Sequence, residues 1–190
     1  MRIRIRSSGA ALLSGVAAGL VVSGAPQPAM ADVQSSSPAG FAIRFEVPVA
    51  AGPADVYSKF FEIGRWWSDD HTYSGKASNM TLKDEPGGCF CETLTGGFLR
   101  HASLEYADKG KHLRLSGGLG PLQELGVQGM LSFDFTAAGK AGTRVVVRYV
   151  ASGHPTDEKG LTAFAPIVDR VLKEQVERLK RYVETGKPAP

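Results

Sequence analysis

Hydrophobic and polar residues alternate along most of this 190-residue chain, and the period of the alternation changes twice. Residues 41–49 alternate between apolar and polar side chains, which is typical of a half-buried strand. Residues 54–67 instead carry apolar side chains three or four positions apart, which predicts a helix with one apolar face. The members of that face are Val56, Phe60, Ile63 and Trp67.

From residue 79 the period is two again, and six further strands are predicted because short alternating segments are separated by glycine-rich turns. They are residues 80–83, 89–94, 98–106, 113–116, 127–135 and 143–151. Links this short join antiparallel neighbours. Residues 158–184 carry a long apolar stripe and predict an amphipathic helix. We therefore predict an α+β fold in which a curved seven-stranded antiparallel sheet wraps around the C-terminal helix and encloses an internal cavity.

The first 31 residues have the features of a secretory signal peptide. Three arginines precede an apolar run over residues 10–22, and Ala29-Met30-Ala31 is a small-x-small cleavage site. The alternative is a retained membrane anchor, but the run is shorter than the roughly 20 residues that span a bilayer. We expect cleavage near Ala31, a periplasmic or secreted protein without a transmembrane segment, a polar tether over residues 32–40 and one domain over residues 41–186.

The charge balance argues against a nucleic-acid partner. The chain has 22 Lys and Arg residues against 19 Asp and Glu residues, and its net charge is +3. The three arginines of the predicted leader account for that excess, so the remainder is formally neutral. Nucleic-acid binding needs an excess of basic residues to neutralise phosphates, and none remains.

Four short stretches resemble the START-like (SRPBCC) superfamily. They are Ala54-Asp55-Val56, Trp66-Trp67, Pro86-Gly87-Gly88 before the strand that holds Phe90, and Val168-Asp169-Arg170-Val171-Leu172. The resemblance covers residues 41–184 and implies the helix-grip fold of polyketide cyclases and Hsp90-ATPase-activator-like domains, here in an exported bacterial member. It implies a shared cavity and no single chemistry. The leader argues against an Hsp90 partner.

Strand register decides which charged side chains enter the cavity. A three-residue turn at residues 95–97 pairs Glu92 with Arg100, both pointing inward, whereas a two-residue turn places Glu92 opposite His101. We favour the first register. The carboxylate and guanidinium then either orient the polar end of a ligand or neutralise each other at the sheet edge.

The two cysteines, Cys89 and Cys91, are two positions apart on a predicted strand. Their Cα atoms would be roughly 6.5–7 Å apart, at the upper edge of the disulfide range, so we expect no bridge between them. Together with His101 they resemble part of a zinc or copper site, but a fourth ligand is missing. We predict no metal site and no cofactor.

The remaining candidates for a ligand site surround the expected cavity. They are Trp67, His71 and Tyr73 at its mouth, Tyr149 on an inward strand position, and Phe164 and Val168 on the C-terminal helix. We predict a protein that holds a small hydrophobic or amphipathic molecule. The alternative is a cyclase- or dehydratase-type enzyme in which His71 or Glu92 transfers a proton. A third hypothesis is a metal or redox protein that uses the two cysteines.

Overall fold

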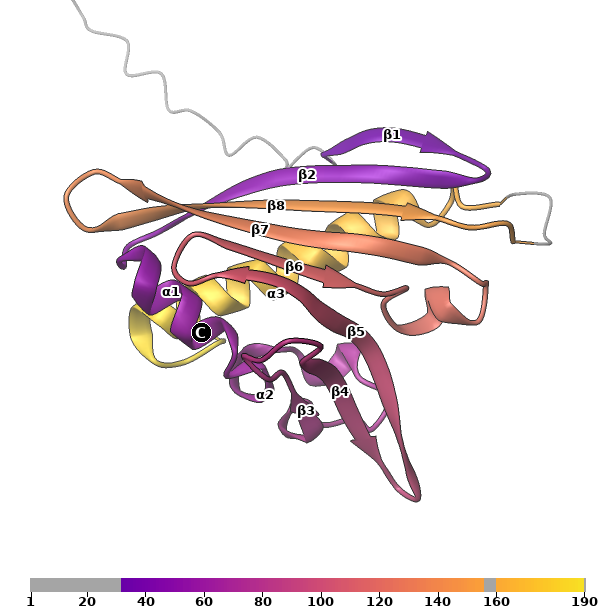
Figure 1. Cartoon of the computed structure of the whole chain (residues 1–190), viewed down its shortest axis with the longest axis horizontal. Coiled ribbons are helices and arrows are strands. Elements are labelled where there is room, and N and C mark those ends of the chain that lie inside the picture. Colours follow the sequence, from indigo (N-terminus) through magenta and orange to yellow (C-terminus); the bar gives the residue numbers. More distant parts are fainter. Residues whose placement is uncertain (1–31, 156–159, 190) are drawn as a thin grey trace, which may run out of the picture. The chain divides into compact units, whose positions relative to one another are not determined.

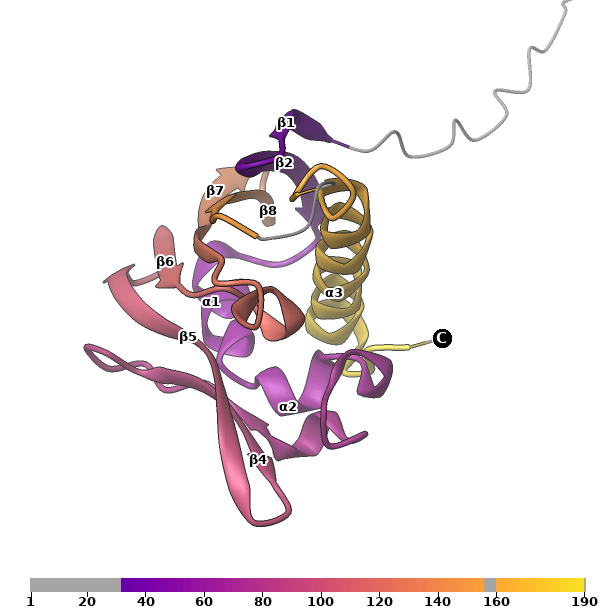
Figure 2. The ribbon, with the colours of Figure 1, turned by 90° about the vertical axis from the view of Figure 1, so that its right-hand side faces the viewer.

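The computed structural model describes residues 32–155 and 160–189 (Figures 1 and 2). The predicted signal peptide lies outside the described residues. In the part of the chain that is described, no helix is long and apolar enough to cross a membrane.

The described residues form an antiparallel sheet of eight strands in the order β1-β2-β8-β7-β6-β5-β4-β3. The strands are β1 (Val33–Ser37), β2 (Gly40–Val49), β3 (Met80–Thr81), β4 (Cys89–Leu94), β5 (Gly97–Asp108), β6 (His112–Ser116), β7 (Gln128–Ala138) and β8 (Gly142–Ser152). The sheet curves around the C-terminal helix α3, Ala165–Thr185 (Figure 2). The predicted α+β architecture is therefore confirmed.

The sheet has one strand more than predicted, because residues 33–37 form β1 and not a tether. Ser36 pairs with Phe41, and Ser37 pairs with Gly40. Four of the five side chains of β1 are exposed, so the strand carries no alternation of apolar and polar residues that a sequence pattern would reveal. Its contribution is to pair backbone groups along the edge of β2.

The helix predicted over residues 54–67 is two helices, α1 (Pro53–Phe60) and α2 (Ile63–Trp66). At the break, the indole Nε1 of Trp66 donates a hydrogen bond of 3.1 Å to the backbone oxygen of Phe60. A carbonyl at a helix end needs such a partner because it lacks an intrahelical one. The break leaves Phe60, Ile63 and Trp66 all buried in the core.

Helix α3 begins seven residues later than predicted, at Ala165, with a proline in its first turn. It ends at Gly186, whose φ of 77° is the left-handed conformation that glycine adopts readily. Leu172, Val176 and Leu179 are buried against the sheet, as the apolar stripe predicts. Residues 158 and 159 of the predicted helix lie outside the described range.

Aromatic side chains fill the interior between α1, α2 and the sheet. Phe60 packs edge-on against Phe133, with 4.6 Å between ring centroids, and Tyr57 lies 6.0 Å from Phe135. These large rings occupy most of the space that the sequence suggests as an internal cavity. The remaining space lies beside the first half of α3.

Candidate functional site: an apolar pocket with a buried histidine–glutamate pair

A pocket of about 530 Å³ lies beside the first half of α3. Its lining comes from α3, from the turns η1 (Asp69–His71) and η3 (Gly120–Gln123), and from the floor of the sheet. The helix supplies the apolar wall, which consists of Phe164, Ile167, Val168, Val171 and Leu172. Small-molecule sites typically have this size and this mostly apolar lining with a few polar groups.

Trp67 forms part of the floor and is held from three directions. Its Nε1 donates a hydrogen bond of 2.9 Å to the backbone oxygen of His71. The guanidinium of Arg178 donates to the backbone oxygens of Trp66 and Trp67 at 2.9 and 3.1 Å. The next backbone N–H, that of Ser68, donates to Oε1 of Gln175 at 2.8 Å. The end of α2 is thereby anchored to α3.

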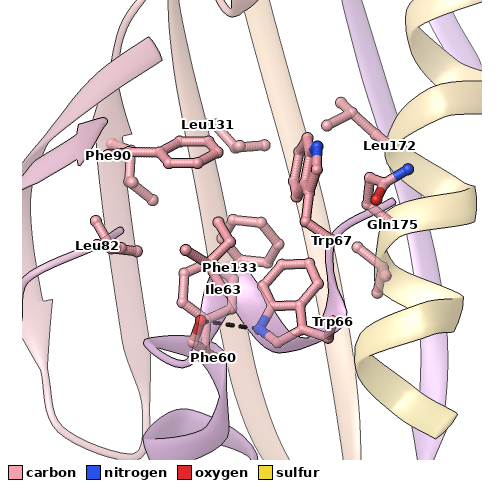
Figure 3. A pocket seen from close by; sticks show the side chains of 12 residues that line it. Phe60, Ile63, Trp66, Trp67, Leu82, Phe90, Leu131, Phe133, Leu172 and Gln175 are labelled. Carbon is pink, nitrogen blue, oxygen red and sulfur yellow. Dashed lines mark hydrogen bonds between the residues drawn. The ribbon is translucent and has the colours of Figure 1, made fainter. Parts of the chain in front are cut away.

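A second, smaller cavity of about 20 Å³ lies deeper in the core, between α2, the sheet and α3 (Figure 3). Trp67, Phe90 and Leu172 line both spaces and so separate them. Gln175 contributes the amide seen at the edge of Figure 3. Its Nε2 is buried and has no hydrogen-bond partner among the described residues.

His101 and Glu92 form a buried pair at the floor of the larger pocket. Nε2 of His101 lies 3.0 Å from Oε2 of Glu92, and the two side chains are 6% and 0% exposed. The other carboxylate oxygen of Glu92 accepts a hydrogen bond of 2.5 Å from the backbone N–H of Ser74. His101 itself lines the pocket, whereas Glu92 lies behind it.

The predicted pairing of Glu92 with Arg100 is wrong, because the turn between β4 and β5 is one residue shorter than that register needs. The turn between β4 and β5 contains two residues, and Glu92 lies opposite Leu99. The alternative register, with Glu92 opposite His101, is also wrong for the backbone pairing, although the two side chains do contact each other. Cys91 pairs with Arg100 and Phe90 with Ala102, so His101 is an extra residue without a partner on β4. His101 is two residues after Leu99, so it lies on the face of β5 that Glu92 shares, and Arg100 lies on the other face, exposed and outside the pocket. The extra residue then brings Ala102 opposite Phe90.

In the folded protein, His101 is a neutral imidazole and Glu92 an ionised carboxylate. Burial lowers the pKa of His101, and the neighbouring Glu92 carboxylate offsets only part of that effect. For Glu92 the largest effect is burial, which raises the pKa. Hydrogen bonds from the side chain and backbone of Ser74, from the backbone of Tyr73 and from His101 outweigh it and hold the pKa of the carboxyl below its usual value. A buried, hydrogen-bonded charge beside a pocket is a typical feature of functional sites.

Cys89 and Cys91 are joined by a disulfide, contrary to the prediction. Their Cα atoms are 5.2 Å apart, which is within the normal range for a disulfide and shorter than the spacing of a regular strand. The bridge brackets Phe90, whose ring lies 5.4 Å from that of Trp67 and 5.0 Å from that of His101.

The structure brings most of the other predicted site residues to the pocket. Trp67, His71, Tyr73, Phe164 and Val168 all line it. His71 lies at the rim, where its Nε2 is 3.1 Å from Oε2 of Glu174, and Tyr73 is 49% exposed.

Tyr149 does not reach the pocket. It is fully buried, and its hydroxyl donates a hydrogen bond of 3.1 Å to the backbone oxygen of Gly117. The residues that the sequence analysis missed are His101 as a pocket group and the residues of η3. No sequence pattern identifies them, because the register of the β4–β5 turn and a loop place them. Among the described residues, no cluster of three or more His, Cys, Asp or Glu side chains has the geometry of a metal site.

No protein-family model and no curated protein sequence matches the chain. Solved structures do match. EF2215, a conserved protein of unknown function from Enterococcus faecalis, is 14% identical over 82% of this chain and 78% of its own, with a TM-score of 0.56.

CalC, a self-sacrificing resistance protein from Micromonospora echinospora, is 16% identical over 77% of this chain and 96% of its own, with a TM-score of 0.53. CalU16 from the same organism is 16% identical over 80% of this chain and 78% of its own, with a TM-score of 0.51. At these identities the likeness concerns the fold alone.

Proposed function

We propose a function from the premise that the chain has the helix-grip fold of the START-like (SRPBCC) superfamily. The chain binds a small hydrophobic or amphipathic molecule in the pocket beside α3. The observation that carries this proposal is a pocket of about 530 Å³ whose wall is apolar and whose floor holds one buried, hydrogen-bonded acid–histidine pair. A ligand fits this arrangement when its body is apolar and one end is polar.

The orientation of the ligand follows from where the apolar and polar groups lie. Its apolar body packs along Ile167, Val168 and Val171 of α3. Its polar end lies on the floor beside His101. Burying an apolar molecule in this way is favourable by about 25 cal/mol for each Å² of surface removed from water.

Binding is tested with a hydrophobic fluorescent probe and two matched substitutions, each of which replaces an exposed β-branched residue with aspartate. Ile167→Asp puts a charge on the pocket wall, at a residue that is 47% exposed, so that the fold tolerates it. Val150→Asp is the control, because Val150 is 56% exposed and does not line the pocket. We expect 1-methylpyrene to bind the unmodified protein and the control equally and to bind Ile167→Asp at least tenfold more weakly. Equal binding to all three proteins would mean that the probe does not occupy the pocket.

The histidine–glutamate pair favours a second candidate function, an enzyme of the cyclase or dehydratase type. A neutral imidazole held by a carboxylate is the usual arrangement of a general base near neutral pH. In such an enzyme His101 accepts a proton from a carbon next to a carbonyl group and later returns one. The test is deuterium exchange at the methyl group of 2-acetylnaphthalene in D₂O, measured by mass spectrometry. Exchange faster than with free imidazole at equal concentration supports the enzyme, and exchange no faster leaves the binding function.

We also propose that the protein works in the periplasm or outside the cell. The charged and apolar leader supports export, and the Cys89–Cys91 disulfide suits an oxidising compartment. Cleavage after Ala31 would leave β1 intact. Sequencing the N-terminus of the mature protein should give Asp32 or a residue within a few positions. An intact leader on protein from the cytosol would contradict export.

A further inference from the structure

We propose that His101 selects the ligand, by accepting at its Nδ1 a hydrogen bond from an acidic hydroxyl group on an aromatic or enolic molecule. This inference rests on the proposed binding function and adds to it the chemical class of the ligand. It follows from the tautomer that the surroundings of His101 impose, from the accessibility of Nδ1 and from the neighbouring rings.

The tautomer is set by a chain of three groups. The backbone N–H of Ser74 donates to Oε1 of Glu92, and Oε2 of Glu92 lies 3.0 Å from Nε2 of His101. An ionised carboxylate only accepts hydrogen bonds, so Nε2 carries the imidazole proton and donates it. In a neutral imidazole the other nitrogen is then unprotonated, and Nδ1 is a hydrogen-bond acceptor.

Nδ1 is available to a ligand. Among the described residues it has no hydrogen-bond partner. In the described part of the chain, three polar side-chain atoms are both fully enclosed and without a partner: His112 Nε2, Asp169 Oδ1 and Gln175 Nε2. Nδ1 of His101 is not among them. Nδ1 therefore keeps accessible surface, and the space that His101 borders is the pocket.

Burial keeps the imidazole of His101 neutral, and the charges around it favour an uncharged ligand. Glu92 faces it from β4, and the Tyr73 ring lies 6.3 Å away in the loop after η1. Burial holds the pKa of His101 below its usual value, so the ring is neutral at pH 7. Apart from the histidines, the acidic and basic side chains in the described lining are Asp70 and Arg170, and both are exposed. The Glu92 charge behind the ring disfavours an anionic ligand end.

The neighbouring rings point to a planar ligand. The rings of Phe90 and Trp67 continue the surface of His101. The ring centroids are 5.0 Å apart between His101 and Phe90 and 5.4 Å apart between Phe90 and Trp67. Aromatic ligands pack well on such a surface. A hydroxyl on an aromatic or enolic carbon is a stronger donor than an aliphatic alcohol and suits an acceptor whose basicity a carboxylate increases.

The first experiment compares two probes of equal shape, 1-hydroxypyrene and 1-methylpyrene, by fluorescence titration of the whole chain. We expect the hydroxyl probe to bind about tenfold more tightly, the factor for one hydrogen bond to a charge-supported acceptor. If neither probe binds, the proposed binding function fails. If both bind equally, the binding function holds and the inference about His101 is wrong.

The second experiment reverses the tautomer with Glu92→Gln. Because the Ser74 N–H needs an acceptor, the new amide oxygen stays on Ser74 and the amide NH₂ group faces Nε2 of His101. Nε2 then accepts, and the proton moves to Nδ1. We expect the preference for 1-hydroxypyrene to fall about tenfold and the binding of 1-acetylpyrene, which carries an acceptor, to increase. Nitrogen-15 NMR of the His101 ring should report a protonated Nε2 in the unmodified protein and a protonated Nδ1 in the variant.

Two further variants complete the test. Arg100→Gln is the control, because it removes an exposed charge next to His101 without touching the pocket, and it should change neither preference nor tautomer. The double variant His101→Phe/Glu92→Gln removes the acceptor without leaving a buried carboxylate unpaired, and it should bind both pyrenes equally. A hydroxyl preference that persists in this double variant would overturn the proposal.

Discussion

Replacing Leu172 with alanine should destabilise the protein less than the same substitution at Leu179, although both leucines are buried on the same face of α3. Leu172 is 3% exposed and Leu179 is 1% exposed. Each substitution removes three carbon atoms, which corresponds to about 2.4 kcal/mol of lost transfer free energy. The two sites differ in the space that the missing atoms leave behind.

At Leu172 that space joins the 530 Å³ pocket, which is open to solvent, to the smaller 20 Å³ cavity. Water can enter it, so we expect a loss of about 2–3 kcal/mol, near the lower end for Leu→Ala. Leu179 does not line either space, and its truncation leaves a closed void that adds a cavity term, for a loss of about 4–5 kcal/mol.

Urea unfolding followed by tryptophan fluorescence measures both values, because Trp66 is buried and reports loss of the core. Ile167→Ala is the control at a position that is 47% exposed, and it should cost less than about 1 kcal/mol. Equal losses at Leu172 and Leu179, or a larger loss at Leu172, would refute the argument that Leu172 separates the two spaces.

Three other predictions concern stability. Folding lowers the pKa of both His101 and Glu92. The free energy of unfolding should therefore fall as the pH drops below 6.5 through the folded-state pKa of His101, and again below 4.5 for Glu92. Urea midpoints between pH 4 and 8 should show this fall, and the double variant His101→Phe/Glu92→Gln should have a flatter profile. The Cys89–Cys91 bridge closes only a very short loop, so by the loop-entropy model its reduction should lower the free energy of unfolding by only about 1.5 kcal/mol. A reduced protein that no longer folds would contradict this value. Arg178→Met removes the donors to the two carbonyls at the end of α2 and should cost about 1.5–3 kcal/mol in the same urea assay, while Arg170→Met on the exposed side of α3 should cost less than about 0.5 kcal/mol.

The sequence alone determined the elements whose side chains alternate between core and solvent. The core strands of the sheet and the buried stripe of α3 were predictable because burial repeats every two residues in a strand and every three to four in a helix. Pocket residues on those elements, such as Phe164 and Val168, followed from the same stripe. The helix break after Phe60 did not, since both of its halves keep apolar residues on one side and the Trp66 indole replaces the missing backbone partner.

Only the tertiary structure decided the chemistry of the pocket. The two-residue turn between β4 and β5 makes His101, and not Arg100, the side-chain partner of Glu92, and Cys89 and Cys91 form a disulfide beside the bulge. The length of this turn and the position of the bulge depend on hydrogen bonds between the two strands, and they leave no mark in the alternation of residues. Because side chains change face at every residue, a shift of one position is enough to replace a guanidinium with an imidazole inside the pocket.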